Sequence, residues 1–313
     1  MPRPLLGLTA SLAALLLLSC GGDDAGKPAG SARDDTHAAA VKLIAASTAP
    51  NAKANSGVID GEVELVLKGV PEFSEPFTSS VSGAFELREG AALPDYELEI
   101  GARNYGVTLI SVGGRSYVTV GTTAFELPAS IRRRLVRNAG TGGNGLTRTL
   151  RQFGVRPWHW ETEERIAGTE TIDGVQTTHL RTSFNAGRML RDANTLLGVL
   201  RSLGITRAVG LPPAITARAR RLFVGAVTSK AGESWFGVAD KLRRKSGFTM
   251  KVRVPMADQA ALGGITGGTV MGRLMISELG RPQQIRAPTK VGSFADFRLA
   301  LDALGDAQEA KGG

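Results

Sequence analysis

The sequence predicts an α+β protein built on antiparallel strands, with its helices gathered in blocks rather than alternating with the strands. Two observations predict this class. Apolar and polar residues alternate with a period of two in short runs separated by glycine and proline, which is typical of antiparallel strands with one face toward water. Longer segments with helical periodicity interrupt these runs in groups, and such segregation indicates α+β rather than α/β.

The first expected helix covers residues 34–47, and a group of strands follows it. Acidic residues and a threonine open this segment, and Val41, Leu43 and Ile44 supply its apolar positions. Alternation then predicts strands over residues 62–68, 81–87, 95–100, 107–112 and 116–120, the last two joined by a turn at Gly113 and Gly114.

The second half of the chain mixes helices and strands. Helical spacing covers residues 129–138, 145–153, 186–203 and 213–227. Strands are expected over residues 158–166, 170–184, 233–238, 247–255 and 269–279, and a short run follows at 284–288. Asp173 and Gly174 divide the 170–184 segment into a hairpin, because Asp-Gly is a strong two-residue turn signal. Ser293 caps a closing helix with Asp296 as its capping-box partner, and this helix presents an apolar face of Phe294, Phe297, Leu301 and Leu304.

These elements predict one α+β domain over residues 34–313. The chain has 313 residues, of which 42% are apolar and 21% charged. This is ordinary globular composition with enough chain for a sizeable core. A curved sheet with helices laid across its concave face is one way for such a domain to enclose a cavity.

The N-terminus carries an export signal that ends at the only cysteine, Cys20. Arg3 provides a basic start, residues 5–18 an apolar stretch and Ser19 a small residue. The apolar stretch is shorter than the about 20 residues that span a bilayer. The pattern resembles a bacterial lipobox, which implies a signal peptide over residues 1–19 and a diacylglyceryl group on the Cys20 thiol. An ordinary secretory signal is the alternative. Residues 20–33 are expected to be a flexible tether.

The formal net charge of +9 is concentrated in arginine and lysine clusters. The largest lie at residues 132–137, 148–151, 218–221 and 241–245. Export and the low aromatic content of 5% argue against a nucleic-acid partner. An anionic membrane surface is the better partner, since each basic side chain near it contributes about 1 kcal/mol. A basic face exposed only to water is the alternative.

Three motifs suggest chemistry, and each has a simpler interpretation. Residues 140–145 match G-x-G-x-x-G, but an arginine-rich segment precedes them and no suitable acidic residue follows, so a link between helices is favoured. His159, Glu161 and Glu163 alternate on one expected strand, where about 7 Å per step separates them too widely for one metal ion. His179 has no nucleophile motif beside it. The sequence therefore predicts no enzyme, no cofactor and no metal site.

A family resemblance extends over nearly the whole chain. It is carried by the lipobox at Cys20 and by residues 81–85 (VSGAF), 93–96 (LPDY), 113–118 (GGRSYV), 168–180 (GTETIDGVQTTHL), 240–244 (DKLRR) and 276–288 (ISELGRPQQIRAP). In this order the motifs resemble the actinobacterial LppX/LprG-type lipoproteins and, more distantly, the LolA/LolB-like lipid carriers. The resemblance implies a curved antiparallel half-barrel with helices packed across its concave face, around a hydrophobic cavity. It also implies binding of acylated lipids or glycolipids and their transfer between membrane layers.

This resemblance makes the inward apolar residues candidates for the cavity lining, although an ordinary core would show the same pattern. The candidates are Val63, Leu65, Leu67, Phe85, Leu98, Ile100, Leu109, Val118, Leu135, Leu146, Leu150 and Phe153. Arg132, Arg133 and Arg134 are the candidates for contact with lipid headgroups, and the helix pair around residues 140–145 is the candidate lid. The sequence thus predicts a lipid-anchored carrier on the extracytoplasmic face of the cell membrane, with an envelope transporter as a possible partner. An envelope interaction or sensor module is the alternative, and a secreted hydrolase is disfavoured.

Overall fold

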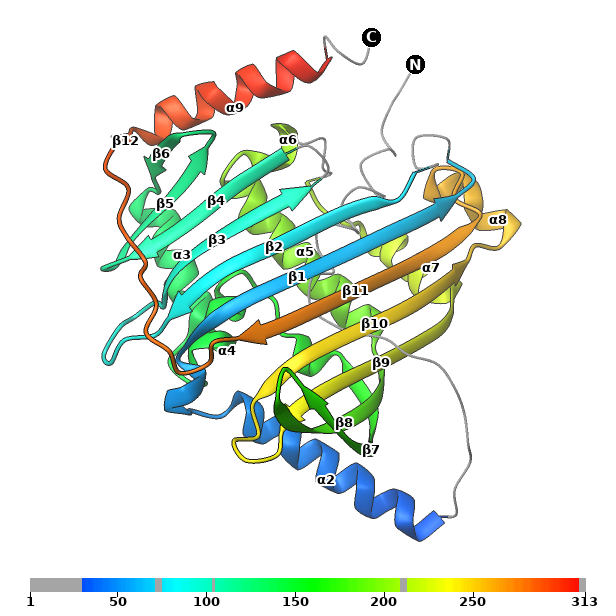
Figure 1. The fold of residues 1–313 in the computed structure, drawn as a ribbon. Helices are drawn as coiled ribbons and strands as arrows, with labels where there is room; N and C mark the ends of the chain where they lie inside the picture. The colour runs from blue at the N-terminus through cyan, green and yellow to red at the C-terminus, as the bar shows by residue number, and fades with distance from the viewer. Residues whose placement is uncertain (1–29, 71–74, 103–104, 209–212, 310–313) are drawn as a thin grey trace.

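A broad, curved sheet forms one layer of the molecule, and most of the helices form a second layer against one of its faces (Figure 1). The computed structural model describes residues 30–70, 75–102, 105–208 and 213–309. The predicted signal peptide, Cys20 and most of the predicted tether lie outside the described residues. The described strands form a 12-stranded sheet in the order β12-β6-β5-β4-β3-β2-β1-β11-β10-β9-β8-β7. The sheet is open, with β12 and β7 at its two edges.

The strands pair antiparallel except at one edge, where β12 runs parallel to β6. Their bounds are β1 Ser56–Lys68, β2 Phe77–Glu86, β3 Asp95–Ala102, β4 Tyr105–Val112, β5 Arg115–Val120, β6 Thr123–Glu126, β7 Glu161–Ile172, β8 Val175–Phe184, β9 Val227–Gly237, β10 Arg243–Arg253, β11 Gly267–Ser277 and β12 Val291–Gly292. The centre of the sheet joins distant parts of the chain, because β1 pairs with β11 from Val58 opposite Ser277 to Lys68 opposite Gly267.

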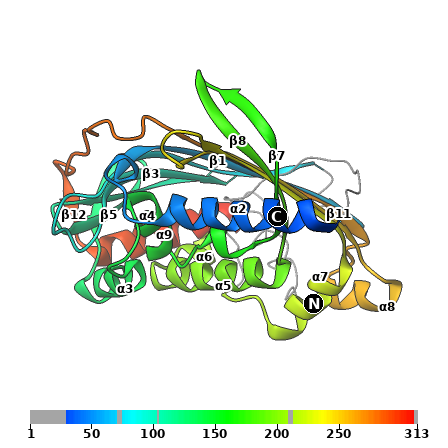
Figure 2. The same ribbon diagram turned by 90° about the horizontal axis from the view of Figure 1, so that it is seen from below.

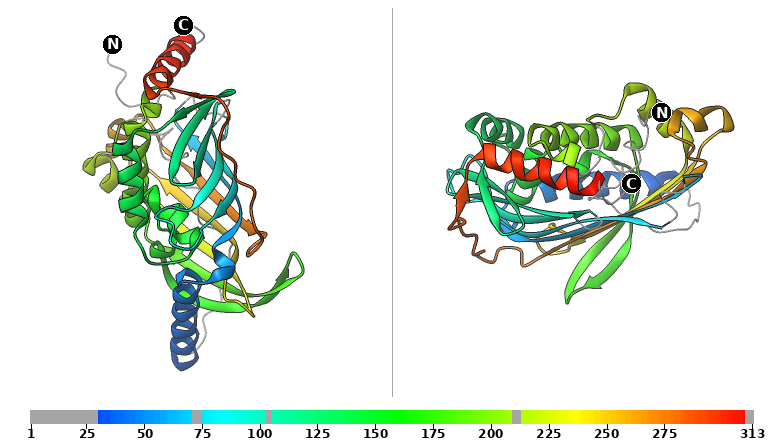
Figure 3. Two further views of the ribbon diagram at one scale, coloured as in Figure 1. Left: turned by 90° about the vertical axis from the view of Figure 1, so that its left-hand side faces the viewer. Right: turned by 90° about the horizontal axis from the view of Figure 1, so that it is seen from above.

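The helix layer packs on the concave face, and the β7–β8 hairpin projects from the other side (Figure 2). The helices are α2 Gly30–Thr48, α3 Ala129–Ala139, α4 Gly145–Gln152, α5 Ala186–Ser202, α6 Ile205–Ala208, α7 Ala217–Ala226, α8 Met256–Gln259 and α9 Phe294–Glu309, with 3-10 turns at Ala52–Ala54, Pro157–His159 and Ala260–Leu262. Views from the side and from above show the same two layers (Figure 3). The predicted class, a curved antiparallel sheet covered by helices on its concave face, is confirmed.

One close packing contact shows how the central strands fit together. Phe248 of β10 lies directly opposite Gly272 of β11. A Cβ atom on Gly272 would come within 2.3 Å of the Phe248 ring. Glycine at this position therefore provides the space that the buried Phe248 ring occupies.

Local signals predicted several boundaries correctly. The hairpin turns at Asp173 and Gly174, which both have positive φ, as a primed turn requires. The capping box is also present, because the Ser293 amide and hydroxyl donate to the Asp296 carboxylate and the Asp296 amide donates to the Ser293 hydroxyl. Phe297 and Leu301 of the closing helix are buried, whereas the side chain of Leu304 lies outside the described part of the chain.

Other boundaries were wrong. Residues 157–159 form a 3-10 turn headed by Pro157 rather than the start of a strand, and β7 then continues through two irregularities to residue 172. Strands β6 and β12 and the first half of β9 were not predicted, because their short or polar segments are held by pairing with neighbours. Helix α2 begins at Gly30, inside the predicted tether, since Ala32 and Arg33 are good helix formers.

Candidate functional site

The concave face of the sheet presents a continuous apolar surface to the helices. Its centre is β1, where Val63 and Leu65 are fully buried and Leu67 is nearly so. Successive strands extend it, because Leu98 lies opposite Leu109, and Leu109 opposite Val118. The predicted lining residues all belong to this one apolar cluster: Val63, Leu65, Leu67, Phe85, Leu98, Leu109, Val118, Leu135, Leu150 and Phe153 are buried in it, and Ile100 and Leu146 pack against it partly exposed.

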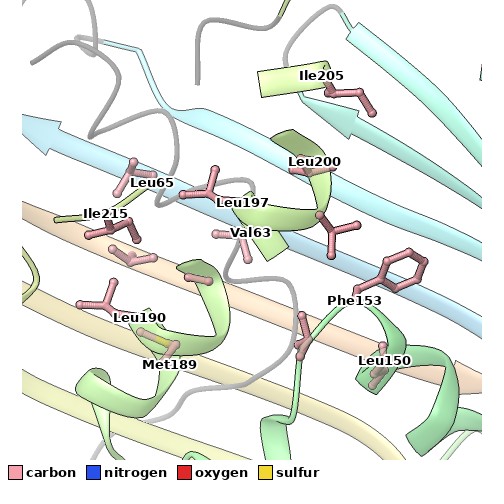
Figure 4. Packing of buried hydrophobic residues seen from close by; sticks show 14 of the residues in the cluster. Val63, Leu65, Leu150, Phe153, Met189, Leu190, Leu197, Leu200, Ile205 and Ile215 are labelled. Atoms are coloured by element: carbon pink, nitrogen blue, oxygen red, sulfur yellow. The ribbon is translucent and has the colours of Figure 1, made fainter. Parts of the chain in front are cut away.

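Helix α5 contributes buried residues to this cluster that were not among the predicted lining residues. Met189, Leu190 and Leu197 are fully buried in the same cluster. Figure 4 shows α5 side chains gathered over Val63 and Leu65 of β1. The signal that could have identified them is the spacing of Met189, Ala193 and Leu197 at four-residue intervals, which places them on one side of a helix.

Helix α4 is fastened to its surroundings by polar contacts. Asn144 caps it by accepting from the Thr147 amide at 3.0 Å and also donates to the carbonyls of Ser47 and Ala49, at 2.8 and 3.1 Å. Arg148 donates to the carbonyl of Ala92 at 2.6 Å. The segment predicted as a lid is thus tied to neighbours on both sides, and opening it would break several buried hydrogen bonds. Its role as a lid stays a prediction.

Polar groups without a protein partner occur beneath α4 and on nearby strands. Within the described residues, the Thr149 hydroxyl and the Gln152 side-chain oxygen are buried and have no hydrogen-bond partner. The same holds for the Ser111 and Ser116 hydroxyls, which lie opposite each other on β4 and β5. Ser111 also lies opposite Tyr96, so these serines share the concave side of the sheet. Buried polar groups normally find partners, and water or a polar group of a ligand would satisfy these.

Burial changes the ionisation of two groups in this region. Desolvation raises the pKa of the Tyr96 phenol far above its ordinary value, because the charged form would be buried. The Tyr96 ring packs edge-on against Phe153 of the α4 C-terminus, with ring centroids 5.8 Å apart. Burial also lowers the pKa of the Arg148 guanidinium. This end of the interior therefore contains polar and titratable groups next to the apolar cluster.

The three arginines predicted to contact headgroups differ in their surroundings. Arg132 of α3 donates to the Gly114 carbonyl at 2.7 Å, and Arg134 donates to the Gly198 carbonyl at 3.2 Å. These two side chains therefore help to hold α3 against the β4–β5 turn and α5. Arg133 is exposed. Of the three predicted headgroup arginines, only Arg133 is thus exposed.

The residues weighed as a metal site do not come together on one strand face. His159 lies in a 3-10 turn, where burial and then Arg156 lower its pKa. Glu161 is buried and pairs with Arg243, and Glu163 has a positive φ at an irregularity of β7. Within the described residues, no group of three or more histidine, cysteine or acidic side chains is arranged to hold a metal ion.

A second cluster lies on the opposite face of the sheet, around the base of the projecting hairpin. His179 stacks on Trp235 with ring centroids 4.6 Å apart, and its Nδ1 lies 2.8 Å from Glu170. The Trp235 indole also donates to Glu170 at 3.0 Å, and Lys245 lies over the Trp235 ring. These contacts fix the hairpin to β9 and β10, and they give His179 a structural role that the sequence did not indicate.

No protein-family model matches the chain, and no curated protein matches it. Among the described residues, no helix combines the length and the apolar character needed to cross a membrane.

Solved structures give a likeness at low identity. The lipoprotein LppX of Mycobacterium tuberculosis has 14% identity and a TM-score of 0.39, over 80% of this chain and 99% of that one. LprF of Mycobacterium bovis has 12% identity and a TM-score of 0.37, over 80% and 97%. A putative outer membrane lipoprotein-sorting protein domain of Vibrio parahaemolyticus has 8% identity and a TM-score of 0.22, over 87% and 99%. Likeness at this level identifies neither a ligand nor an activity. The fold class is established by the strand order and the helix layer of this chain itself.

Proposed function

We propose that this protein is a lipoprotein that binds the acyl chains of a lipid or glycolipid between its sheet and its helices and carries them between envelope layers. The observation that carries the proposal is the large apolar cluster shared by the concave face and the helix layer. Burying a CH₂ group contributes about 0.8 kcal/mol. An acyl chain of about 16 carbons would then contribute on the order of 10 kcal/mol before ordering costs.

The unpartnered polar groups at the α4 end support an orientation for the ligand. Thr149 and Gln152 would face the polar part of the lipid, and the acyl chains would extend along α5 toward Leu190 and Leu197. The role expected for such a site is binding and transfer of the lipid. An envelope transporter is the partner that would deliver or receive the lipid.

The proposal includes a membrane anchor on Cys20, which would keep the domain on the extracytoplasmic face of the cell membrane. The mass of the N-terminal peptide tests this directly, since a diacylglyceryl cysteine at position 20 has a distinct mass. Replacing the residue, as Cys20→Ser, is expected to release the protein from the membrane fraction. A Cys20→Ser protein that remains in the membrane fraction after complete signal cleavage and a high-salt wash, which screens docking by basic residues, would contradict the anchor.

Lipid binding is tested by native mass spectrometry of the full chain, extracted from cell membranes and freed of detergent in the instrument. A carrier is expected to show added lipid mass beyond that of the anchor, and extraction identifies it. Full-length protein with no added mass, from cells of the native lipid composition, would contradict the carrier function.

The projecting hairpin favours a second candidate, an envelope interaction module. Residues 167–171 of β7 are all exposed. The hairpin projects from the sheet on the side away from the helices (Figure 2). In this case the partner would bind the hairpin and the interior would hold no lipid. Crosslinking in cells from Thr169 of the hairpin, with Leu299 of α9 as the control position, would detect that partner.

A further inference from the structure

We propose that the end of the molecule formed by α7 and the β10–β11 connection rests on an anionic bilayer surface. The inference deepens the proposed carrier function, because it assigns the surface through which lipid would be exchanged with the membrane. It differs from the headgroup contact predicted at α3. The evidence is the two-sided character of α7, the exposed apolar residues beside it, and the distribution of charge.

Helix α7 has two different faces. Ala219, Phe223 and Ala226 are buried and point into the apolar interior. The opposite face carries Arg218, Arg221 and three small or apolar residues, and all five are exposed: Ala217, Arg218, Arg221, Val224 and Gly225. Neither arginine forms an ion pair in the part of the chain that the structure describes. A face of this kind, basic and apolar together, is suited to the boundary between headgroups and acyl chains.

Exposed apolar side chains gather at the same end. Met256 at the start of α8 is 86% exposed, and Val224 of α7 is 39% exposed. The two helices lie side by side at this end in views from below and from above (Figures 2 and 3). Strand pairing also brings the two helices close. Val227, which directly follows α7, pairs with Val252, four residues before α8 begins at Met256. An exposed methionine loses its contact with water when it enters the outer part of a bilayer, and that transfer is favourable.

The charge of this end matches an anionic surface. Residues 213–232 contain three arginines and a lysine and no acidic residue. Lys68 and Arg253 add to them, because both lie opposite Gly267 on the two sides of β11 and both are exposed. Among the described residues, Asp258 of α8 is acidic, and so is the exposed Glu75, two residues before Phe77, which lies opposite Leu65 of β1. Anionic headgroups would therefore meet a mainly basic surface.

The apolar interior lies directly behind this surface. Ile215, Phe223 and Leu262 are buried members of the cluster that the proposed function assigns to the acyl chains. A lipid that leaves the interior at this end would pass beside α7 into the bilayer. On α3, Arg132 and Arg134 donate to protein carbonyls, whereas Arg218 and Arg221 of α7 are exposed.

The test is hydrogen–deuterium exchange on the full chain reconstituted in lipid nanodiscs of phosphatidylcholine, with or without phosphatidylglycerol. We expect amide protection over residues 217–226 and 255–262 in the anionic discs, weaker protection in the neutral discs, and none added over residues 129–139. The double variant Arg218→Gln/Arg221→Gln is expected to reduce the docked population about 30-fold, the change that corresponds to about 1 kcal/mol for each basic residue. Met256→Gln is expected to reduce it about tenfold.

Matched controls separate the surface from a general effect of charge or apolarity. Arg133→Gln on α3 and Leu299→Gln on α9, where Leu299 is 69% exposed, should leave the protection unchanged. Protection over residues 129–139 in place of 217–226, equal protection in neutral discs, or the same protection by polyglutamate without a bilayer would each overturn the proposal. Bound lipid is measured on the same variants by native mass spectrometry. If docking is absent while lipid is still bound, the docking proposal fails and the carrier proposal stands. If lipid is absent while docking is retained, the carrier proposal fails and the docking surface stands.

Discussion

Arg243 and Glu161 form a bidentate ion pair inside the protein, with both nitrogen–oxygen distances at 2.8 Å. The charges are compensated by further groups. Arg243 also donates to the hydroxyls of Ser234 and Ser246, and Ser234 donates to Glu161. The guanidinium lies over the Phe236 ring at 4.8 Å. The pair therefore fastens the start of β7 to β9 and β10. It lies next to a small apolar cluster in which Ala40 and Ile44 of α2 pack with Leu180 and Phe236.

Breaking this pair from one side is expected to destabilise the fold strongly. Arg243→Met leaves a buried carboxylate without its partner, and such a loss costs about 3–5 kcal/mol. The free energy of unfolding in urea measures it. Arg273→Met is the control, because Arg273 forms an exposed pair with Glu62 and should cost about 1 kcal/mol or less. Equal losses in the free energy of unfolding for the two substitutions would show that the buried pair stabilises the fold no more than the exposed pair does.

Gly272→Ala is expected to destabilise the central sheet. Its Cβ would lie 2.3 Å from the Phe248 ring, and overpacking of this kind costs about 1–3 kcal/mol. Phe248→Leu in the same chain should restore part of the loss, and thermal unfolding measures both. Gly225→Ala serves as the control, since nothing lies within 4 Å of its Cβ. A stable Gly272→Ala protein with no gain from Phe248→Leu would contradict the packing argument.

Asn144→Ala is expected to cost more than the removal of an ordinary helix cap. Asn144 is fully buried, caps α4 and donates to two further carbonyls, which would be left without their donor. A loss of about 2–3 kcal/mol follows. Asn185→Ala, which removes the exposed cap of α5, should cost about 1 kcal/mol. Chemical denaturation compares them, and a smaller loss at Asn144 would count against α4 being tied down.

Tyr96 is expected to make stability fall at alkaline pH. Burial raises its pKa in the folded state above the value of 10.0 that an exposed tyrosine has. Below pH 10 both states carry the neutral phenol, so there is no effect. As the pH rises past 10, the unfolded state ionises first and the free energy of unfolding decreases. Absorbance at alkaline pH should show Tyr96 titrating only with unfolding, and Tyr96→Phe should remove this part of the loss. A phenolate signal from Tyr96 in the folded protein would contradict the prediction.

Leu65→Trp tests whether the interior has room for a ligand. In a carrier, the larger ring occupies space that lipid would fill, so bound lipid falls while the fold is kept. In a filled core, overpacking lowers stability by about 1–3 kcal/mol and no lipid is found in either protein. Native mass spectrometry and thermal unfolding are measured together. Met271→Trp, on the outer face of the neighbouring strand, should change neither quantity.

Features that depend on neighbouring residues were predictable from the sequence. Alternation placed Val63, Leu65 and Leu67 on the inner side of their strand, and all are buried there. The Asp173–Gly174 turn and the Ser293–Asp296 capping box were also identified correctly. Each rests on backbone geometry or a hydrogen bond that spans only a few residues. The identification of Cys20 as an acylated residue rests on a short motif in the same way and stays a prediction.

The tertiary structure alone decided which segments meet. Periodicity does not say that β1 pairs with β11, about 200 residues further along the chain, nor that α5 covers Val63. Nor does the sequence show that Arg132 and Arg134, candidates for headgroup contact, donate to carbonyls of other elements. The sequence by itself determined the class of fold, the inner faces of the strands and the basic character of the chain. Pairing order, the buried Arg243–Glu161 pair and the exposed α7 face were decided by contacts between distant residues, because such contacts depend on shape and burial that no local pattern records.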